Sequence, residues 1–154
     1  MRRGALSRRA VVHGPRVAVV GAGSWGTTFG KILADGGADV TMWARRPELA
    51  QEIAQAKRNT DYLPGINLPM SMTATSHLSE ALDGAEQVYL SIPSQALRQN
   101  LKAVRPLIAN TDAPIVSLMK GVERRTGLRM SQVIAQELHI DPSRIAVASG
   151  PNLA

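Results

Sequence analysis

A short apolar run that ends in a glycine-rich turn constrains this sequence more than any other feature. The run is Val17–Val20, and the turn Gly21-Ala22-Gly23-Ser24-Trp25-Gly26 follows it directly. Apolar residues then recur at helical spacing over Trp25–Ala34, and Gly36-Gly37 is placed to end that helix. A buried strand, a tight turn and a helix in this order predict the first unit of a parallel α/β sheet.

The rest of the chain continues the alternation of strands and helices. Asn59–Pro69 is predicted to be a loop, because Pro64, Gly65 and Pro69 interrupt it. Ser94 is placed as the N-cap of a later helix. Further strands are predicted at Asp39–Trp43, Met70–Ala74, Gln87–Ile92, Pro114–Met119 and Arg144–Ala148, and helices at Pro47–Lys57, Leu78–Leu82, Ser94–Val104 and Gly127–Leu138. This order predicts an α/β fold of the Rossmann type: a doubly wound, mainly parallel sheet in a single domain.

The three glycines of the turn have separate expected roles in binding a dinucleotide. Gly21 permits the tight turn, Gly23 lets the backbone approach a pyrophosphate, and Gly26 lets the helix pack closely on the strand. The amides of Ser24 and Trp25 would point at phosphate oxygens, at the positive end of the helix. A structural turn that binds no ligand is the alternative.

The end of the second predicted strand bears on the choice of cofactor. An NAD-selective domain usually has Asp or Glu there, to bond the ribose 2′-hydroxyl. This chain has Arg45 and Arg46 instead, with no carboxylate before Glu48. Because guanidinium groups bind phosphate oxygens in a bidentate manner, the pair favours the 2′-phosphate of NADP over NAD. The alternative is that both arginines are simply solvated.

Other polar and glycine-containing segments follow later strands. These are Ser91–Ser94, Met119–Gly121 and Ser149–Asn152. Ligands bind beyond the carboxyl ends of the strands in an open parallel sheet, so these segments are expected at the binding edge. Lys120 would supply a charged donor to a phosphate or carbonyl oxygen there.

Composition excludes several classes of protein. The chain has 154 residues, no cysteine and no apolar run long enough to span a bilayer. The three histidines are not spaced as metal ligands, so no metal site is expected. The net charge of +6 owes much to four arginines of the first fifteen residues, which lack the apolar core of a secretory signal. We interpret 1–15 as a basic disordered tail and 16–154 as the dinucleotide-binding domain. The alternative for the tail is a nucleic-acid-binding arm, although the tail has no aromatic residue on which bases could stack.

Six motifs occur in one order and spacing, and together they define a resemblance to a known family. They are Gly21–Thr27 (GAGSWGT), Trp43–Pro47 (WARRP), Tyr62–Pro69 (YLPGINLP), Ser91–Ser94 (SIPS), Lys120-Gly121 and Ser149–Ala154 (SGPNLA). The series closely resembles the amino-terminal domain of bacterial NAD(P)-dependent glycerol-3-phosphate dehydrogenase. The resemblance extends from Arg16 to Ala154.

The resemblance implies an activity and a set of contacts. The family reduces dihydroxyacetone phosphate to sn-glycerol 3-phosphate, a phospholipid precursor. By resemblance, the cofactor is contacted by Ser24, Trp25, Arg45, Lys120 and Ala154, with Arg46 assisting at the 2′-phosphate. Lys120, Gly150 and Asn152 match substrate-binding positions.

The resemblance also implies what this chain lacks. The family's proton-handling lysine belongs to a helical carboxy-terminal domain, and this chain stops before it, so no catalytic residue is assigned within the 154 residues. General acid–base catalysis typically contributes about 10²–10⁴-fold in rate, so we expect the truncated chain to bind cofactor with negligible turnover. The absence of cysteine is compatible with the reducing cytoplasm, where we expect the protein, and a homodimer is compatible with the full-length enzyme. A non-catalytic nucleotide-sensing module is the competing hypothesis.

Overall fold

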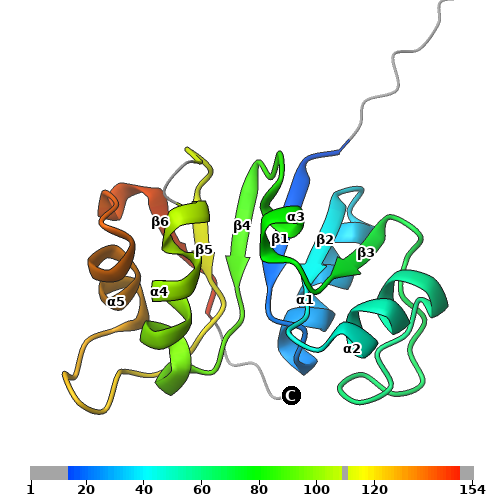
Figure 1. Ribbon diagram of the computed structural model, residues 1–154, viewed down its shortest axis with the longest axis horizontal. Helices are drawn as coiled ribbons and strands as arrows, with labels where there is room; N and C mark the ends of the chain where they lie inside the picture. Colours follow the sequence, from blue (N-terminus) through cyan, green and yellow to red (C-terminus); the bar gives the residue numbers. More distant parts are fainter. Residues whose placement is uncertain (1–13, 109–110, 150–154) are drawn as a thin grey trace, which may run out of the picture.

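A computed structural model describes residues 14–108 and 111–149. Within them, six strands form a single sheet in the order β3-β2-β1-β4-β5-β6, which runs from right to left across Figure 1. Their bounds are β1 Arg16–Val20, β2 Asp39–Trp43, β3 Met72–Thr75, β4 Gln87–Leu90, β5 Ile115–Ser117 and β6 Ile145–Val147. The first strand, β1, lies in the centre of the sheet. Strands β2 and β3 lie on one side of it, and β4, β5 and β6 lie on the other.

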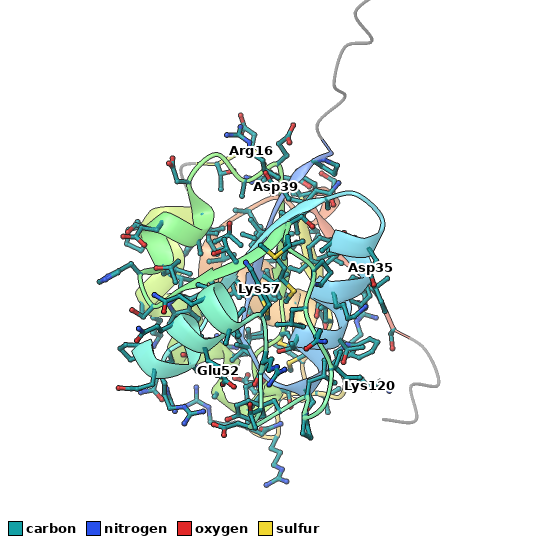
Figure 2. The ribbon with its side chains drawn as sticks, turned by 90° about the vertical axis from the view of Figure 1, so that its right-hand side faces the viewer. Arg16, Asp35, Asp39, Glu52, Lys57 and Lys120 are labelled. Carbon is teal, nitrogen blue, oxygen red and sulfur yellow. The ribbon has the colours of Figure 1, made fainter. Side chains whose placement is uncertain are left out.

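Every pair of neighbouring strands in this sheet is parallel, as the sequence predicts. Val20 at the end of β1 is in register with Trp43 of β2 and Leu90 of β4. The carboxyl ends of the central strands therefore lie side by side. Figure 2 shows the resulting polarity, with Arg16 and Asp39 at one end of the molecule and Lys120 at the other.

Helices cover both faces of the sheet, because alternate residues of the buried strands point to opposite faces. The helical segments are α1 Ser24–Asp35, α2 Pro47–Gln51, η1 Glu52–Ala56, α3 Leu78–Leu82, η2 Ser94–Ala96, α4 Leu97–Ile108, α5 Met130–Leu138 and η3 Pro142–Arg144. Val17 and Val19 of β1 pack in the core beneath α1, α2 and η1. Ala18 and Val20 pack in the core beneath α3, α4 and α5.

The two glycines after α1 end the helix as predicted. Gly36 is the C-cap residue, and its N–H donates to the Ile32 carbonyl. Gly37 has a φ of +98°, in the left-handed region that glycine adopts without a Cβ penalty. The chain can therefore reverse within two residues and enter β2.

Two predicted helices have different ends in the structure. Ser94 was predicted to cap a helix over Ser94–Val104, but it begins a 3₁₀ turn, and no side-chain capping bond is formed there. The helix α4 starts at Leu97 and continues to Ile108 with Pro106 inside it. Its buried residues Leu101, Val104 and Ile108 explain the extra turn, since packing outweighs the local cost of the proline.

The second predicted helix divides into two segments. It starts at Pro47, a favoured early position, but changes at Glu52 to the π-helical turn η1. Lys57, at φ +53°, then ends it. The wider turn places Ile53 fully in the core.

Other predicted boundaries move by a few residues. The strand predicted from Met70 starts at Met72, because Met70 is 82% exposed and Met72 is fully buried. The helix predicted from Gly127 starts at Met130, where the Gln132 side chain accepts a hydrogen bond from the backbone N–H of the N-cap residue Arg129 at 3.0 Å. Strands β4, β5 and β6 are each shorter than predicted.

In the described part of the chain, no helix has both the length and the apolar character that crossing a membrane requires.

Candidate cofactor-binding site

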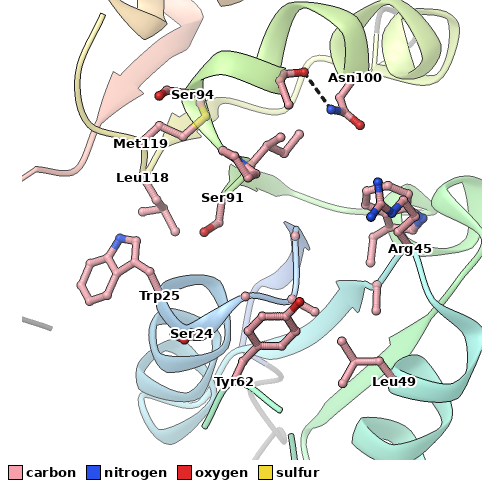
Figure 3. A pocket seen from close by; sticks show the side chains of 18 of the residues that line it. Ser24, Trp25, Arg45, Leu49, Tyr62, Ser91, Ser94, Asn100, Leu118 and Met119 are labelled. Atoms are coloured by element: carbon pink, nitrogen blue, oxygen red, sulfur yellow. Dashed lines mark hydrogen bonds between the residues drawn. The ribbon is translucent and has the colours of Figure 1, made fainter.

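A cavity of about 620 Å³ lies beyond the carboxyl ends of the central strands. This volume is within the usual range of small-molecule sites, roughly 300–1,000 Å³. Its walls come from the glycine turn, the ends of β2, β4 and β5, and a loop residue, Tyr62 (Figure 3). The predicted residues Gly21, Gly23, Ser24, Trp25, Arg45, Arg46 and Lys120 all line it.

Backbone hydrogen bonds that extend the sheet ladder hold this edge together. Gly21 N donates to Trp43 O (3.1 Å), Ser91 N to Val20 O (2.9 Å) and Leu118 N to Leu90 O (2.9 Å). The segments that follow β1, β4 and β5 are thus each bonded to the end of a neighbouring strand. Residues as far apart in sequence as Gly21 and Lys120 thus contribute to the walls of one cavity.

Two glycines of the turn are required by the protein itself. Gly21 has a φ of +117°, and a Cβ there would lie 2.2 Å from the Ser91 carbonyl oxygen. A Cβ on Gly26 would lie 2.2 Å from the Gly21 carbonyl oxygen. Strand β4 and the helix α1 therefore approach the turn so closely that neither position has room for a side chain.

Gly23 is different, because the fold gives no internal reason for a glycine there. Its φ is −74°, which any residue can adopt, and a Cβ would meet no described atom within 4 Å. Gly23 nevertheless lines the cavity. A small residue at this position suits a ligand that approaches the backbone closely, and a dinucleotide pyrophosphate makes that approach.

The electrostatics of the cavity favour an anion. Its described lining includes the cations Arg45, Arg46 and Lys120 and no carboxylate. The amino end of α1 faces the same space, and its first turn has no acidic residue to neutralise the helix dipole. The site therefore presents positive charge from side chains and backbone together.

The two arginines have different surroundings. Arg46 forms an exposed ion pair with Asp61, a carboxylate from the following loop. The hydrogen bond and charge of Asp61 raise the pKa of Arg46 above its ordinary value. Arg45 is exposed on the cavity wall, and Figure 3 shows it on the side opposite Trp25.

An aromatic cluster supports the other end of the cavity. The rings of Trp25 and Phe29 meet edge to face at 5.6 Å between centroids, and Phe29 contacts Tyr89 at 5.4 Å. The indole nitrogen of Trp25 is buried and has no hydrogen-bond acceptor among the described residues. The Trp43 indole, in contrast, donates to the Ser76 carbonyl at 3.0 Å.

Lys120 lies in the loop that follows β5, and an ion-pair network beside it holds that loop. Arg98 of α4 donates through Nε and Nη2 to both carboxylate oxygens of Glu123, at 2.7 and 2.9 Å. Its Nη1 donates to Glu137 of α5. The Arg98 guanidinium and the Thr126 hydroxyl lower the pKa of Glu123 to about 2.

The sequence did not predict the contribution of the loop between η1 and β3. Tyr62, from this loop, lines the cavity, and Asn59 is completely buried. Asn59 donates to the Ala22 carbonyl and to the Thr27 hydroxyl, so it reaches the glycine turn itself. Its only sequence signal is a polar residue at the start of the predicted loop Asn59–Pro69, which does not distinguish it from solvated neighbours.

Three residues predicted to bind cofactor or substrate lie outside the described residues. They are Gly150, Asn152 and Ala154. The structure describes the chain up to Ser149, directly after Ala148, whose N–H donates to the Ser117 carbonyl at 3.0 Å.

The parallel six-stranded sheet, its glycine turn and the cavity define a nucleotide-binding domain of the Rossmann type. The family model for the N-terminus of NAD-dependent glycerol-3-phosphate dehydrogenase matches residues 16–154. The chain therefore belongs to this family. This result confirms the resemblance inferred from the six motifs.

Curated relatives agree with the family model. The chain is 68% identical over 136 residues to the glycerol-3-phosphate dehydrogenase [NAD(P)+] of Leifsonia xyli, a match that covers 88% of this chain and 37% of the relative. It is 59% identical over 138 residues to the enzyme of the same name from Corynebacterium glutamicum, with 90% and 41% covered. The chain thus spans about two fifths of the length of these relatives.

Solved structures show the same fold. The glycerol-3-phosphate dehydrogenase of Coxiella burnetii superposes with a TM-score of 0.76 at 27% identity, covering 88% of this chain and 40% of that one. That of Saccharomyces cerevisiae superposes with a TM-score of 0.79 at 27% identity, covering 91% and 43%.

Proposed function

We propose that the chain is the cofactor-binding part of an NAD(P)-dependent glycerol-3-phosphate dehydrogenase, with 16–154 forming the domain. The observation that carries the proposal is Gly23. It is a glycine at a position where the fold tolerates a side chain, and it lies on a cationic cavity at the amino end of α1. Family membership supports the reaction: interconversion of dihydroxyacetone phosphate and sn-glycerol 3-phosphate.

Each lining residue has a proposed task in holding the cofactor. The turn from Gly21 to Gly26, with the amides of Ser24 and Trp25, binds the pyrophosphate. Arg45 binds the adenosine ribose end and favours NADP, because its guanidinium can form two hydrogen bonds to a 2′-phosphate. The ion pair of Arg46 with Asp61 limits that residue to an assisting role.

Lys120 is the proposed meeting point of cofactor and substrate. It follows β5 on the cavity wall, where its ammonium group would hold an oxygen of either molecule. The bound nicotinamide supplies or accepts the hydride, and the protein supplies position and charge. By resemblance, Gly150 and Asn152 hold substrate and Ala154 contacts cofactor.

The 154 residues alone are proposed to bind without appreciable turnover. They span about two fifths of the relatives, and by resemblance the proton-handling lysine belongs to the remaining part. A cytoplasmic location and a homodimer of the complete enzyme are proposed as well.

Calorimetric titration of the chain with NADPH, NADH and ADP-ribose tests the proposal. We expect saturable binding of all three, with NADPH tightest. A folded sample that binds none of them would contradict the assignment. Binding that is equally tight for NADPH and NADH would contradict only the preference for NADP.

A further inference from the structure

We infer that Asn59 is a positioning residue that fixes the pyrophosphate-binding turn in its binding conformation; the inference rests on the proposed function. Its side chain is completely buried, although it belongs to a loop whose neighbours are mostly exposed. Its Nδ2 donates to Ala22 O at 3.0 Å and to Thr27 Oγ1 at 2.7 Å. Its Oδ1 accepts from the Tyr62 backbone N–H at 3.2 Å. The amide thus uses both donors and its acceptor.

The bond to Ala22 acts on the part of the turn that faces the ligand. Ala22 lies between Gly21 and Gly23, and its carbonyl shares a rigid peptide plane with the Gly23 N–H. In a trans peptide these two groups point in opposite directions, so a bond that fixes the carbonyl also fixes the N–H. This plane rotates about ψ of Ala22 and φ of Gly23, and because Gly23 has no Cβ to restrict that rotation, an external anchor is needed to fix the plane.

The bond to Thr27 ties the same amide to the helix that receives the phosphate. Thr27 is completely buried, and its hydroxyl lies 3.4 Å from the Ala22 carbonyl oxygen. Asn59, Thr27 and Ala22 therefore form a closed triangle beneath the turn. The triangle holds the peptide plane at a fixed angle to the axis of α1.

The third bond connects the turn to the cavity wall. By accepting from the Tyr62 N–H, Asn59 holds the start of the segment whose side chain lines the cavity. Figure 3 shows the Tyr62 ring beside the glycine turn. One buried amide thus sets the distance between the turn and the loop that covers it.

The test compares ligands with and without a pyrophosphate. In Asn59→Ala, affinity for NADPH and ADP-ribose is expected to fall about tenfold, since buried partners lose their hydrogen bonds. Adenosine 2′-phosphate, which has no pyrophosphate, should bind as to the unmodified chain. Asn67→Ala is the matched control: Asn67 is exposed in the same loop and pairs only with Arg58 among described residues, at 3.4 Å.

Two variants at Thr27 keep the inference testable if Asn59→Ala does not fold. Thr27→Val keeps the shape and removes the hydroxyl, and should weaken NADPH binding; Thr27→Ser restores the hydroxyl and should rescue it. Unchanged NADPH affinity in a folded Asn59→Ala, an equal loss for adenosine 2′-phosphate, or failure of rescue by serine would each overturn the inference. Absence of NADPH binding by the unmodified chain would instead overturn the proposed function.

Discussion

The glycines of the turn show how one residue type can serve two different purposes. At Gly21 the positive φ and the contact with the Ser91 carbonyl make glycine a condition of folding. At Gly23 the backbone is ordinary and the space beyond it is open. The sequence has glycine at both positions, and only their structural environments show that the two glycines have different roles.

The first prediction follows from this contrast. Gly23→Ala should weaken NADPH binding by about tenfold or more, because the methyl group would occupy the space of a phosphate, while the free energy of unfolding stays within about 0.5 kcal/mol. Gly21→Ala should instead lower that free energy by about 1–3 kcal/mol or more through backbone strain. Calorimetry and urea denaturation separate the two effects. Loss of stability in Gly23→Ala would contradict the assignment of this glycine to the ligand.

Arg45 carries the second prediction. Arg45→Ala should weaken NADPH by about 10–100-fold, as expected for a charged hydrogen-bond partner, and NADH by much less. Titration of the variant with both cofactors measures the ratio. Arg58→Ala, which removes an exposed arginine outside the cavity lining, is the control for net charge. Equal losses for the two cofactors would remove Arg45 from the 2′-phosphate site.

At the scale of elements, an ion-pair network fixes the loop that carries Lys120. Arg98 in α4 bonds Glu123 in that loop and Glu137 in α5. Gln95 adds a bond to the Val122 carbonyl at 3.0 Å and accepts from the Arg124 N–H at 3.2 Å. The middle of the loop between β5 and α5 is therefore attached to η2 and α4, although it contains no helix or strand before Met130.

The third prediction concerns the pH dependence of this network. The pKa of Glu123 is about 2 in the folded chain, below its ordinary value of 4.5. A carboxylate with a lowered pKa stabilises the fold above its unfolded pKa, and this stabilisation is lost as the pH falls through the folded value. Glu123→Gln should therefore lower the melting temperature at pH 7, and the difference from the unmodified chain should shrink between about pH 4.5 and pH 2. A difference that does not depend on pH would show that the charge is not responsible.

At the scale of the whole molecule, the parallel arrangement of the strands brings residues that are distant in sequence into one site. The carboxyl ends of β2, β1, β4 and β5 lie together, so segments from Gly21 to Lys120 share a cavity. Backbone hydrogen bonds join these strand ends to one another at this edge. The cavity walls are therefore built from the ends of the sheet itself.

The fourth prediction uses this coupling between fold and site. NADPH at 100 times its dissociation constant should stabilise the chain by about 2.7 kcal/mol, because it binds the folded state alone. Thermal unfolding with increasing NADPH measures the shift, and inorganic phosphate at equal concentration is the control for ionic effects. In Gly23→Ala the shift at the same NADPH concentration should be smaller. No shift with NADPH would contradict a site formed by the folded domain.

The fold was largely predictable, because the hydrophobic pattern is local. Val17–Val20 before a glycine turn, and apolar residues at helical spacing after it, identify β1 and α1 with no knowledge of their neighbours. Element ends were less predictable, as Ser94 and Pro106 show. Both are strong local signals, and the packing of α4 against the sheet overrides them.

The candidate site also has a part that could be predicted from the sequence and a part that could not. The sequence by itself determined the glycine turn, the arginines after β2 and the lysine after β5, because each follows a strand and strand ends meet at one edge in a parallel sheet. Only the tertiary structure decided that Asp61 engages Arg46, that Arg98 holds the loop of Lys120, and that Asn59 anchors the turn. These partners lie 15 to 37 residues apart in sequence, and their bonds depend on distance and direction in space, which no local pattern encodes.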